Sequence, residues 1–349
     1  MADLSKGRIL VTGGAGFIGS ALIWELNRRG LKNILVADLL GNSAKWKNLV
    51  PLQFADYIEG DDLLMRLDVH GHQFEDIQTI FHLGACSSTA ETDAAYLIRN
   101  NFEYSKALAQ FALAGDRRFV YASSAATYGS LEEQVSESIP LAALRPLNMY
   151  GYSKHLFDCW AERADILPLI TGIKYFNIFG PNENHKGDMR SLVHKAYYQI
   201  LETWRVSLFK SYRAEFRDGE QRRDFLYIKD AMDATVYLAE HVEGGGLFNV
   251  GSGEAHTWLS LANAIFSALG QPARIDFIQM PEELQDKYQY FTCASIDKLR
   301  SFGYKRPLTP LADAVRDYVL NYLIPGRHLG DEPVSPQMSH MQREEVGGV

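Results

Sequence analysis

Residues 8–38 of this chain read RILVTGGAGFIGSALIWELNRRGLKNILVAD. The run from Arg8 to Thr12 predicts a strand, the pattern from about Phe17 to Arg29 predicts a helix, and Asn33 to Asp38 predicts a second strand. A strand, a helix and a second strand in this order form a right-handed βαβ unit with parallel strands. The chain is therefore expected to begin with the opening unit of a parallel sheet.

Three more apolar runs have the length of strands and are separated by segments long enough for helices. They are Thr79 to Leu83, Phe119 to Ser123 and Gly172 to Ile178. Strands that alternate with helices build sheets whose two faces are both covered. We therefore predict an α/β fold, a Rossmann-type doubly wound parallel sheet with a smaller C-terminal lobe.

The second half of the chain has a looser pattern. The polar, arginine-rich stretch from Lys210 to Asp224 is expected to form a loop, and Leu247 to Val250 is expected to return to the sheet. Helical patterns follow around Trp258 to Leu269 and Pro310 to Tyr322.

The composition excludes several classes of protein. With 349 residues, 46% of them hydrophobic and 22% charged, the chain has the balance of an ordinary folded protein. A net charge of −8 does not favour nucleic acid as a partner. The chain shows neither a leader pattern nor about 18 uninterrupted apolar residues, so we expect a cytoplasmic protein that does not span a membrane. Cys86, Cys159 and Cys293 are spaced neither as a disulfide framework nor as a metal site.

The glycine-rich turn from Thr12 to Gly19 lies between the first strand and the first helix. Its glycines allow a tight turn and a close approach of backbone to a pyrophosphate, which the positive end of the helix also attracts. This context predicts a dinucleotide site. Its candidate residues here are Gly13, Gly16, Phe17, Ile18 and Gly19.

Asp38 ends the second strand, at the position where a carboxylate can bind the adenosine ribose. That feature favours NAD, but Lys45 and Lys47 follow and could neutralise the 2′-phosphate of NADP. The residues alone leave this choice open. A further strand ends in Leu83, Gly84, Ala85 and Cys86, where a bound dinucleotide is expected to lie, with Cys86 as a packing residue rather than a nucleophile.

Tyr150 and Lys154 are four residues apart on one face of a predicted helix. A cation near a phenol favours the phenolate, so we expect Lys154 to lower the pKa of Tyr150 for proton exchange with a substrate hydroxyl. Tyr152 lacks this spacing. Ser124, which we prefer over Ser123, ends a strand and offers a hydroxyl to hold the reacting oxygen.

In these motifs the chain resembles the extended short-chain dehydrogenase/reductase family. The similarity covers about residues 8 to 323 and includes the glycine-rich turn, Ser123-Ser124, Tyr150 with Lys154, and the run from Tyr175 to Pro181. The resemblance implies a bound nicotinamide dinucleotide, a nucleotide-sugar substrate and assembly as a homo-oligomer.

The resemblance also narrows the reaction. Family members that dehydrate sugars carry an Asp-Glu pair where this chain has Ala125 and Ala126. The segments 84–89, 123–129 and 184–187 are most similar to the epimerases of ADP-bound heptoses, which implies inversion at C6 with NADP in lipopolysaccharide core synthesis. A 4-epimerase of UDP-glucose and UDP-galactose that uses NAD is the alternative. A less favoured alternative is a protein that binds a dinucleotide but has no catalytic activity.

An epimerase of this type needs a second proton carrier, because the ketone intermediate must turn over before hydride returns to its other face. The resemblance assigns this role to Lys186, which without it would be a solvated loop charge. It adds as cofactor contacts Leu39, Ser87, Asn100, Lys154, Ile178 and Lys186. It implies as substrate contacts Ser124, Asn177, Asp188, Lys195, Phe209, Arg223 and Tyr288.

These assignments predict the organisation of the chain. Residues 1–178 form the dinucleotide-binding domain, to which the chain returns around 225–258. Residues 179–323 form mainly the substrate-binding lobe. Residues 324–349 turn polar and are expected to form a flexible tail.

Overall fold

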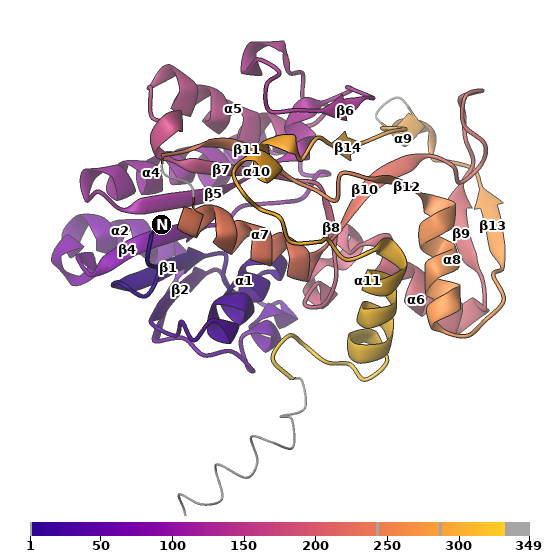
Figure 1. Ribbon diagram of the computed structural model, residues 1–349, viewed down its shortest axis with the longest axis horizontal. Helices are drawn as coiled ribbons and strands as arrows, with labels where there is room; N and C mark the ends of the chain where they lie inside the picture. The colour runs from indigo at the N-terminus through magenta and orange to yellow at the C-terminus, as the bar shows by residue number, and fades with distance from the viewer. Residues whose placement is uncertain (1, 242–243, 286–287, 332–349) are drawn as a thin grey trace, which may run out of the picture.

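The computed structural model describes residues 2–241, 244–285 and 288–331. It confirms the predicted α/β fold, because seven strands pair in parallel in one central sheet (Figure 1). Their order across the sheet is β11 (Gly246–Val250), β7 (Thr171–Tyr175), β5 (Arg118–Ser124), β4 (Ile77–His82), β1 (Arg8–Thr12), β2 (Ile34–Asp38) and β3 (Asp56–Glu59).

The chain reverses its direction of travel across the sheet at β1, which pairs with β2 on one side and β4 on the other. At such a point the connections diverge and leave a crevice outside the carboxyl ends of the strands. Thr12, Asp38, His82 and Ser124 all end strands at this edge. The topology therefore places the crevice beside the predicted dinucleotide site.

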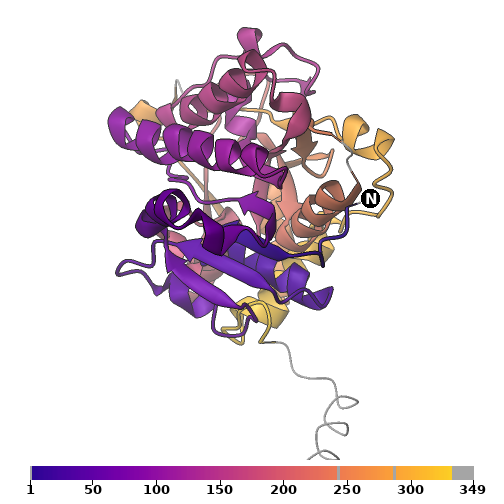
Figure 2. The same ribbon diagram turned by 90° about the vertical axis from the view of Figure 1, so that its left-hand side faces the viewer.

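Alternate residues of the strands enter two apolar clusters, as expected for a sheet covered on both faces. Ile9 and Val11 pack with α1 (Phe17–Arg28) and α7 (Ile228–His241). Leu10 packs on the other face with α2 (Gly60–Val69), α4 (Tyr104–Ala114) and α5 (Met149–Arg163). Figure 2 shows the helices on both sides of the strands.

A smaller lobe lies at one end of the sheet, on the right in Figure 1. A three-stranded sheet combines β8 (Asn177–Phe179), β10 (Arg222–Tyr227) and β12 (Ala255–Thr257), and β9 (Val206–Phe209) pairs with β13 (Ile275–Ile278). The lobe's helices are α6 (Leu192–Thr203), α8 (Trp258–Ala268) and α11 (Leu311–Tyr318). Shorter elements are α3 (Ala94–Leu97), β6 (Gln134–Val135), α9 (Glu282–Gln285), β14 (Cys293–Ala294) and α10 (Asp297–Ser301).

Two predicted elements were wrong in detail. The run from Gly172 to Ile178 forms two strands in different sheets, because β7 pairs with β5 and β11 whereas β8 pairs with β10. The predicted loop from Lys210 to Asp224 ends early, because β10 begins at Arg222. The partners of β10 are β8 and β12, which are distant from it in sequence, so the local pattern of residues could not reveal this strand.

Residues 324–331, expected to belong to the tail, pack against the body of the protein. Leu329 is fully buried and its backbone N–H donates to Asn182 Oδ1. The remaining part of the predicted tail, 332–349, lies outside the described residues. Among the helices that are described, none combines the length and the apolar character needed to cross a bilayer.

Candidate active site

The glycine-rich turn brings β1, α1 and the end of β4 into very close contact. Gly13 has φ +68°, and a Cβ there would lie 2.7 Å from Gly84 Cα. A Cβ on Gly19 would lie 2.0 Å from the carbonyl oxygen of Gly13. Both positions exclude larger residues, and the backbone at the start of α1 is left open toward the crevice.

Asp38 holds this turn with its carboxylate. Oδ2 accepts hydrogen bonds from the backbone N–H groups of Ala15 and Gly16 at 2.8 and 3.1 Å. Oδ1 accepts from Lys45 Nζ and from the N–H of Leu39, both at 2.6 Å. Lys45 therefore neutralises the carboxylate at the place where the adenosine end of a dinucleotide is expected.

Two cavities of about 420 and 430 Å³ meet at the glycine-rich turn and form the crevice. Both are lined by Gly13, Asp38, Lys45, Gly84 and Ala85. Every predicted cofactor residue lines at least one of them, the others being Gly16, Phe17, Ile18, Gly19, Leu39, Leu83, Cys86, Ser87, Asn100, Lys154, Ile178 and Lys186. The residues present therefore fit a nicotinamide dinucleotide.

The cavity of 420 Å³ also contains Ser124, Tyr150 and Lys154. Asn148 caps α5 by accepting a hydrogen bond from the N–H of Gly151, and this starts the helix so that Tyr150 and Lys154 face the cavity one turn apart. Ser124 lines the same cavity as the Tyr150 phenol, and its hydroxyl accepts a hydrogen bond from the N–H of Ala126. Tyr152 is 45% exposed and lies outside this lining.

The expected lowering of the Tyr150 pKa by Lys154 was wrong. Burial raises the pKa of Tyr150, and the polar hydroxyl of Ser124 offsets this only in part. Burial also lowers the pKa of Lys154 to about 8, opposed by the carboxylate of Asp158. The cost of desolvating a phenolate therefore exceeds the attraction of an ammonium group that is itself buried.

A buried group of charges that the sequence analysis missed supports these residues. Asp158 accepts hydrogen bonds from Ser123 Oγ at 2.7 Å and from the Tyr121 hydroxyl at 2.9 Å, and its Oδ2 lies 3.5 Å from Lys174 Nζ. Ser123 also lines the cavity, but its hydroxyl is engaged by Asp158. The spacing of Asp158, four residues after Lys154, is a signal that could have identified it.

Asn101 is a second support that sequence reasoning missed. It lies in a π-helical turn, Ile98–Glu103, and its buried amide bonds both backbone groups of Cys86 and the hydroxyl of Ser153. It therefore joins the crevice floor to α5. The neighbouring Asn100, which was predicted, lines the cavity of 430 Å³ and donates to the carbonyl of Tyr96.

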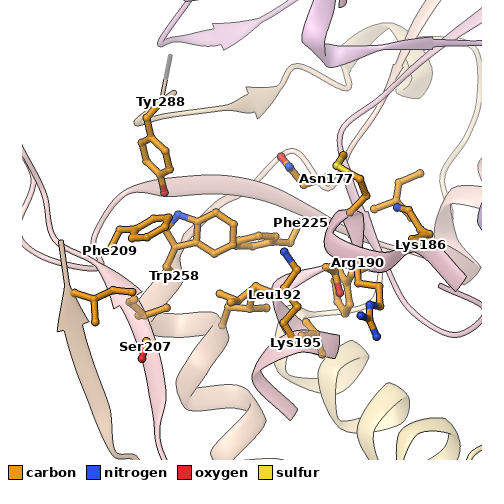
Figure 3. A pocket seen from close by; sticks show the side chains of 18 residues that line it. Asn177, Lys186, Arg190, Leu192, Lys195, Ser207, Phe209, Phe225, Trp258 and Tyr288 are labelled. Carbon is orange, nitrogen blue, oxygen red and sulfur yellow. The ribbon is translucent and has the colours of Figure 1, made fainter. Parts of the chain in front are cut away.

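A third cavity, of about 540 Å³, opens beside the crevice in the lobe (Figure 3). Five predicted substrate or catalytic residues line it, namely Asn177, Lys186, Lys195, Phe209 and Tyr288. Phe225 and Trp258, which were not predicted, complete an aromatic group with Phe209 and Tyr288. Figure 3 shows Phe209, Trp258 and Tyr288 together on one side, with Lys186, Arg190 and Lys195 across from them.

Two predicted substrate contacts are placed differently. Arg223 is buried, and its guanidinium donates to the backbone carbonyls of Arg222 and Gln289. Its Cζ lies 5.1 Å from the ring centroid of Tyr288. The guanidinium therefore supports the aromatic group instead of offering free N–H donors to a phosphate. Asp188 is exposed and lies outside the linings of the three cavities.

Lys186 lines both the crevice and the aromatic cavity. It lies in the turn Asn184–Met189, and its Nζ is 4.9 Å from the ring centroid of Phe17. Burial lowers its pKa, and the carboxylate of Glu183 opposes this. The amine is therefore placed where it can exchange a proton with a molecule that occupies both cavities.

Comparison with known proteins identifies relatives along nearly the whole chain. The model of the NAD dependent epimerase/dehydratase family matches residues 9–251. An ADP-L-glycero-D-manno-heptose-6-epimerase from Nitratidesulfovibrio vulgaris is 47% identical over 315 residues, covering 90% of this chain and 97% of the relative. The enzyme of that name from Fusobacterium nucleatum is 44% identical over 325 residues, covering 90% and 98%.

Solved structures that are similar to this chain are also structures of sugar-nucleotide epimerases. The ADP-L-glycero-D-manno-heptose-6-epimerase of Helicobacter pylori superposes with a TM-score of 0.76 at 27% identity, covering 91% of this chain and 97% of that one. A UDP-glucuronic acid 4-epimerase from Bacillus cereus, solved with UDP-glucuronic acid and NAD, gives 0.71 at 25% identity, covering 89% and 98%. The chain therefore belongs to the NAD-dependent epimerase/dehydratase family, the extended short-chain dehydrogenase/reductases that its motifs resemble.

Proposed function

We propose that this protein inverts C6 of ADP-D-glycero-D-manno-heptose to give ADP-L-glycero-D-manno-heptose, for lipopolysaccharide core synthesis. One observation carries the proposal: Tyr150 and Lys186 line the same crevice, and Lys186 also lines the aromatic cavity beside it. Relatives that are 42–47% identical over about nine tenths of the chain carry the name of this reaction.

A nicotinamide dinucleotide in the crevice supplies the acceptor and then the donor of the hydride. Because burial raises its pKa, Tyr150 must first lose its proton at a cost in free energy. The phenolate then takes the proton of the C6 hydroxyl while the C6–H bond breaks, and Ser124 holds the reacting oxygen by a hydrogen bond. The product of this half-reaction is a C6 ketone. Because Tyr150 and Ser124 come from adjacent elements, α5 and β5, their relative position is rigid.

The second half-reaction needs a proton at a different place. Once the ketone has turned over, its oxygen points away from Tyr150, and hydride returns to the opposite face of C6. Lys186 then protonates the oxygen as the new C–H bond forms, and in the reverse direction it removes that proton. A lysine whose pKa is lowered by burial suits both directions, because burial reduces the free-energy cost of forming the neutral amine from the ammonium group.

The nucleotide part of the substrate fits the aromatic cavity. Phe209, Trp258 and Tyr288 offer ring faces to a base, and Lys195 faces the same cavity with a charge suited to the diphosphate. Asn177 lines the cavity near Lys186, at the end where the sugar would lie.

Turnover by the purified protein without added cofactor tests the proposal. We expect nuclear magnetic resonance to show ADP-D-glycero-D-manno-heptose converting to the mixture of C6 epimers. Absence of inversion, together with conversion of UDP-galactose to UDP-glucose, would favour a 4-epimerase. A protein that retains a dinucleotide but converts neither sugar would fit the non-catalytic alternative.

We further propose NADP as the preferred dinucleotide, with Lys45 as the residue that binds its 2′-phosphate. Family members bind NAD, and NAD occupies several of the related structures. In this chain, however, the Lys45 ammonium lies 2.6 Å from Asp38, which reduces the repulsion between Asp38 and a phosphate. The dinucleotide released on denaturation identifies the natural cofactor.

Replacing Lys45 by alanine is expected to weaken NADP binding by about tenfold, since one charge-assisted contact is lost. NAD binding is expected to hold or improve, because Asp38 is then free to bind the ribose. Titration calorimetry of the cofactor-free protein measures both affinities. Lys47→Ala is the matched control, as Lys47 is exposed and rests on Trp46. Equal losses for both dinucleotides would contradict the role of Lys45.

Assembly of this protein as a homo-oligomer stays a prediction.

A further inference from the structure

The side chain of Asn48 joins the glycine-rich turn to the segment that carries Lys186. Asn48 is 1% exposed, and its Nδ2 donates to the carbonyl oxygens of Ala15 at 3.0 Å and Asn182 at 3.1 Å. The same Nδ2 also lies 3.3 Å from His185 Nδ1, so the amide group contacts the residue next to Lys186 as well. One buried side chain thus bridges the loop that cradles the dinucleotide and the loop that leads to the second proton carrier.

Asn182 holds the other end of this bridge. It is buried and has φ +78°, a left-handed backbone conformation that a residue with a side chain adopts at a cost. Its Nδ2 donates to Ser20 Oγ in α1 at 3.0 Å, and its Oδ1 accepts from the N–H of Leu329 at 2.9 Å. The surrounding contacts therefore determine the backbone at the residue where the Lys186 loop begins.

Residues 328 and 329 complete the arrangement from outside. His328 Nδ1 lies 2.8 Å from Asn48 Oδ1. Because Oδ1 can only accept, Nδ1 carries the proton and donates. Leu329 is fully buried beside Asn182. The chain thus returns from α11 past α1, as the yellow segment in the lower part of Figure 1 shows, to contact both asparagines.

The position of Lys186 depends on this bridge. Lys186 follows Asn182 by four residues, its backbone N–H donates to the carbonyl of Glu183, and its amine rests on the ring of Phe17 at the start of α1. Glu183 in turn accepts from the N–H and hydroxyl of Ser191. Movement of the Asn182 backbone away from the glycine-rich turn would carry the amine away from the crevice.

We propose that Asn48, Asn182, His328 and Leu329 form a clamp that positions Lys186 against the glycine-rich turn. The C-terminal segment is then a positioning element for one of the two proton transfers, although it lies outside both substrate and cofactor cavities. This inference rests on the proposed function in one respect, the role of Lys186 as the proton carrier for one C6 epimer.

His328→Ala removes the outer contact while leaving the crevice lining unchanged. In single turnovers, the absorbance of reduced nicotinamide reports oxidation of each C6 epimer separately. We expect His328→Ala to slow oxidation of one epimer by about three- to tenfold, the loss of one hydrogen bond. The affected epimer is the one that Lys186→Met affects. His328→Asn, whose Nδ2 takes the place of Nδ1, is expected to restore the rate.

Equal slowing of both epimers would show a general loosening of the fold and would overturn the proposal, as would an unchanged rate for both. His72→Ala is the matched control, because His72 is exposed on the far side of the sheet after α2. Hydrogen exchange of the backbone amides of residues 184–190 gives a second readout, expected to accelerate in His328→Ala and not in His328→Asn. If the unaltered protein oxidises neither epimer, the proposed function fails, and the exchange measurement still decides the clamp.

Discussion

Tyr150→Phe is expected to lower kcat by about 10³-fold, with little change in the binding of dinucleotide or substrate. The phenol lies in the crevice with Ser124 and Lys154, and in the proposed mechanism it exchanges a proton with the C6 hydroxyl. Phenylalanine keeps the ring and removes only the hydroxyl. Both epimers would react slowly, because each complete inversion passes through the Tyr150 step once.

Steady-state kinetics with the ADP-heptose substrate, together with a thermal melt, measures this effect. Tyr152→Phe is the matched control, since Tyr152 lies two residues away on α5 and is 45% exposed. The control should retain the activity and melting temperature of the unaltered protein. A Tyr150→Phe protein with normal kcat would remove Tyr150 from the mechanism.

Lys186→Met is the second substitution with a large expected effect, a loss of about 10²- to 10³-fold in complete inversion. Methionine preserves the apolar stem against Phe17 and removes the amine that lines both cavities. Oxidation of the epimer that uses Tyr150 should continue at nearly the normal rate. The ketone and reduced cofactor should then accumulate, because the second proton transfer is blocked.

Rapid mixing with each epimer separates these half-reactions by the absorbance of reduced nicotinamide. Lys32→Met serves as control, since Lys32 is exposed after α1. If Lys186→Met slowed both epimers equally, Lys186 would not be a second proton carrier. If it slowed neither, the two-carrier mechanism would be untenable.

Much of the central sheet could be predicted because its signals are local. The strand from Arg8 to Thr12, the turn from Thr12 to Gly19 and the helix after it agree with β1 and α1 nearly residue by residue. A buried parallel strand requires an apolar run, and a tight turn requires glycine. Each of these elements can therefore be recognised from a few adjacent residues. The pairing of β8 with β10 cannot be recognised in this way, and the boundary between β7 and β8 was therefore missed.

The candidate site divides in the same way. The spacing of Tyr150 and Lys154 follows from the helical repeat, and the sequence by itself determined that they share one face and that the glycine-rich turn precedes a helix. The structure decided how their charges behave. Burial, which depends on neighbours distant in sequence, raises the pKa of Tyr150 where the local pair was expected to lower it.

Tertiary structure alone also brought Lys186 to the boundary of two cavities, turned Arg223 toward backbone carbonyls, and packed His328 against Asn48, 280 positions earlier in the chain. The physical reason is the range of the interactions. Helix periodicity, strand alternation and turn geometry depend on residues that are close in sequence, so short segments are enough to predict them. Desolvation and buried hydrogen bonds arise only when remote segments exclude water together.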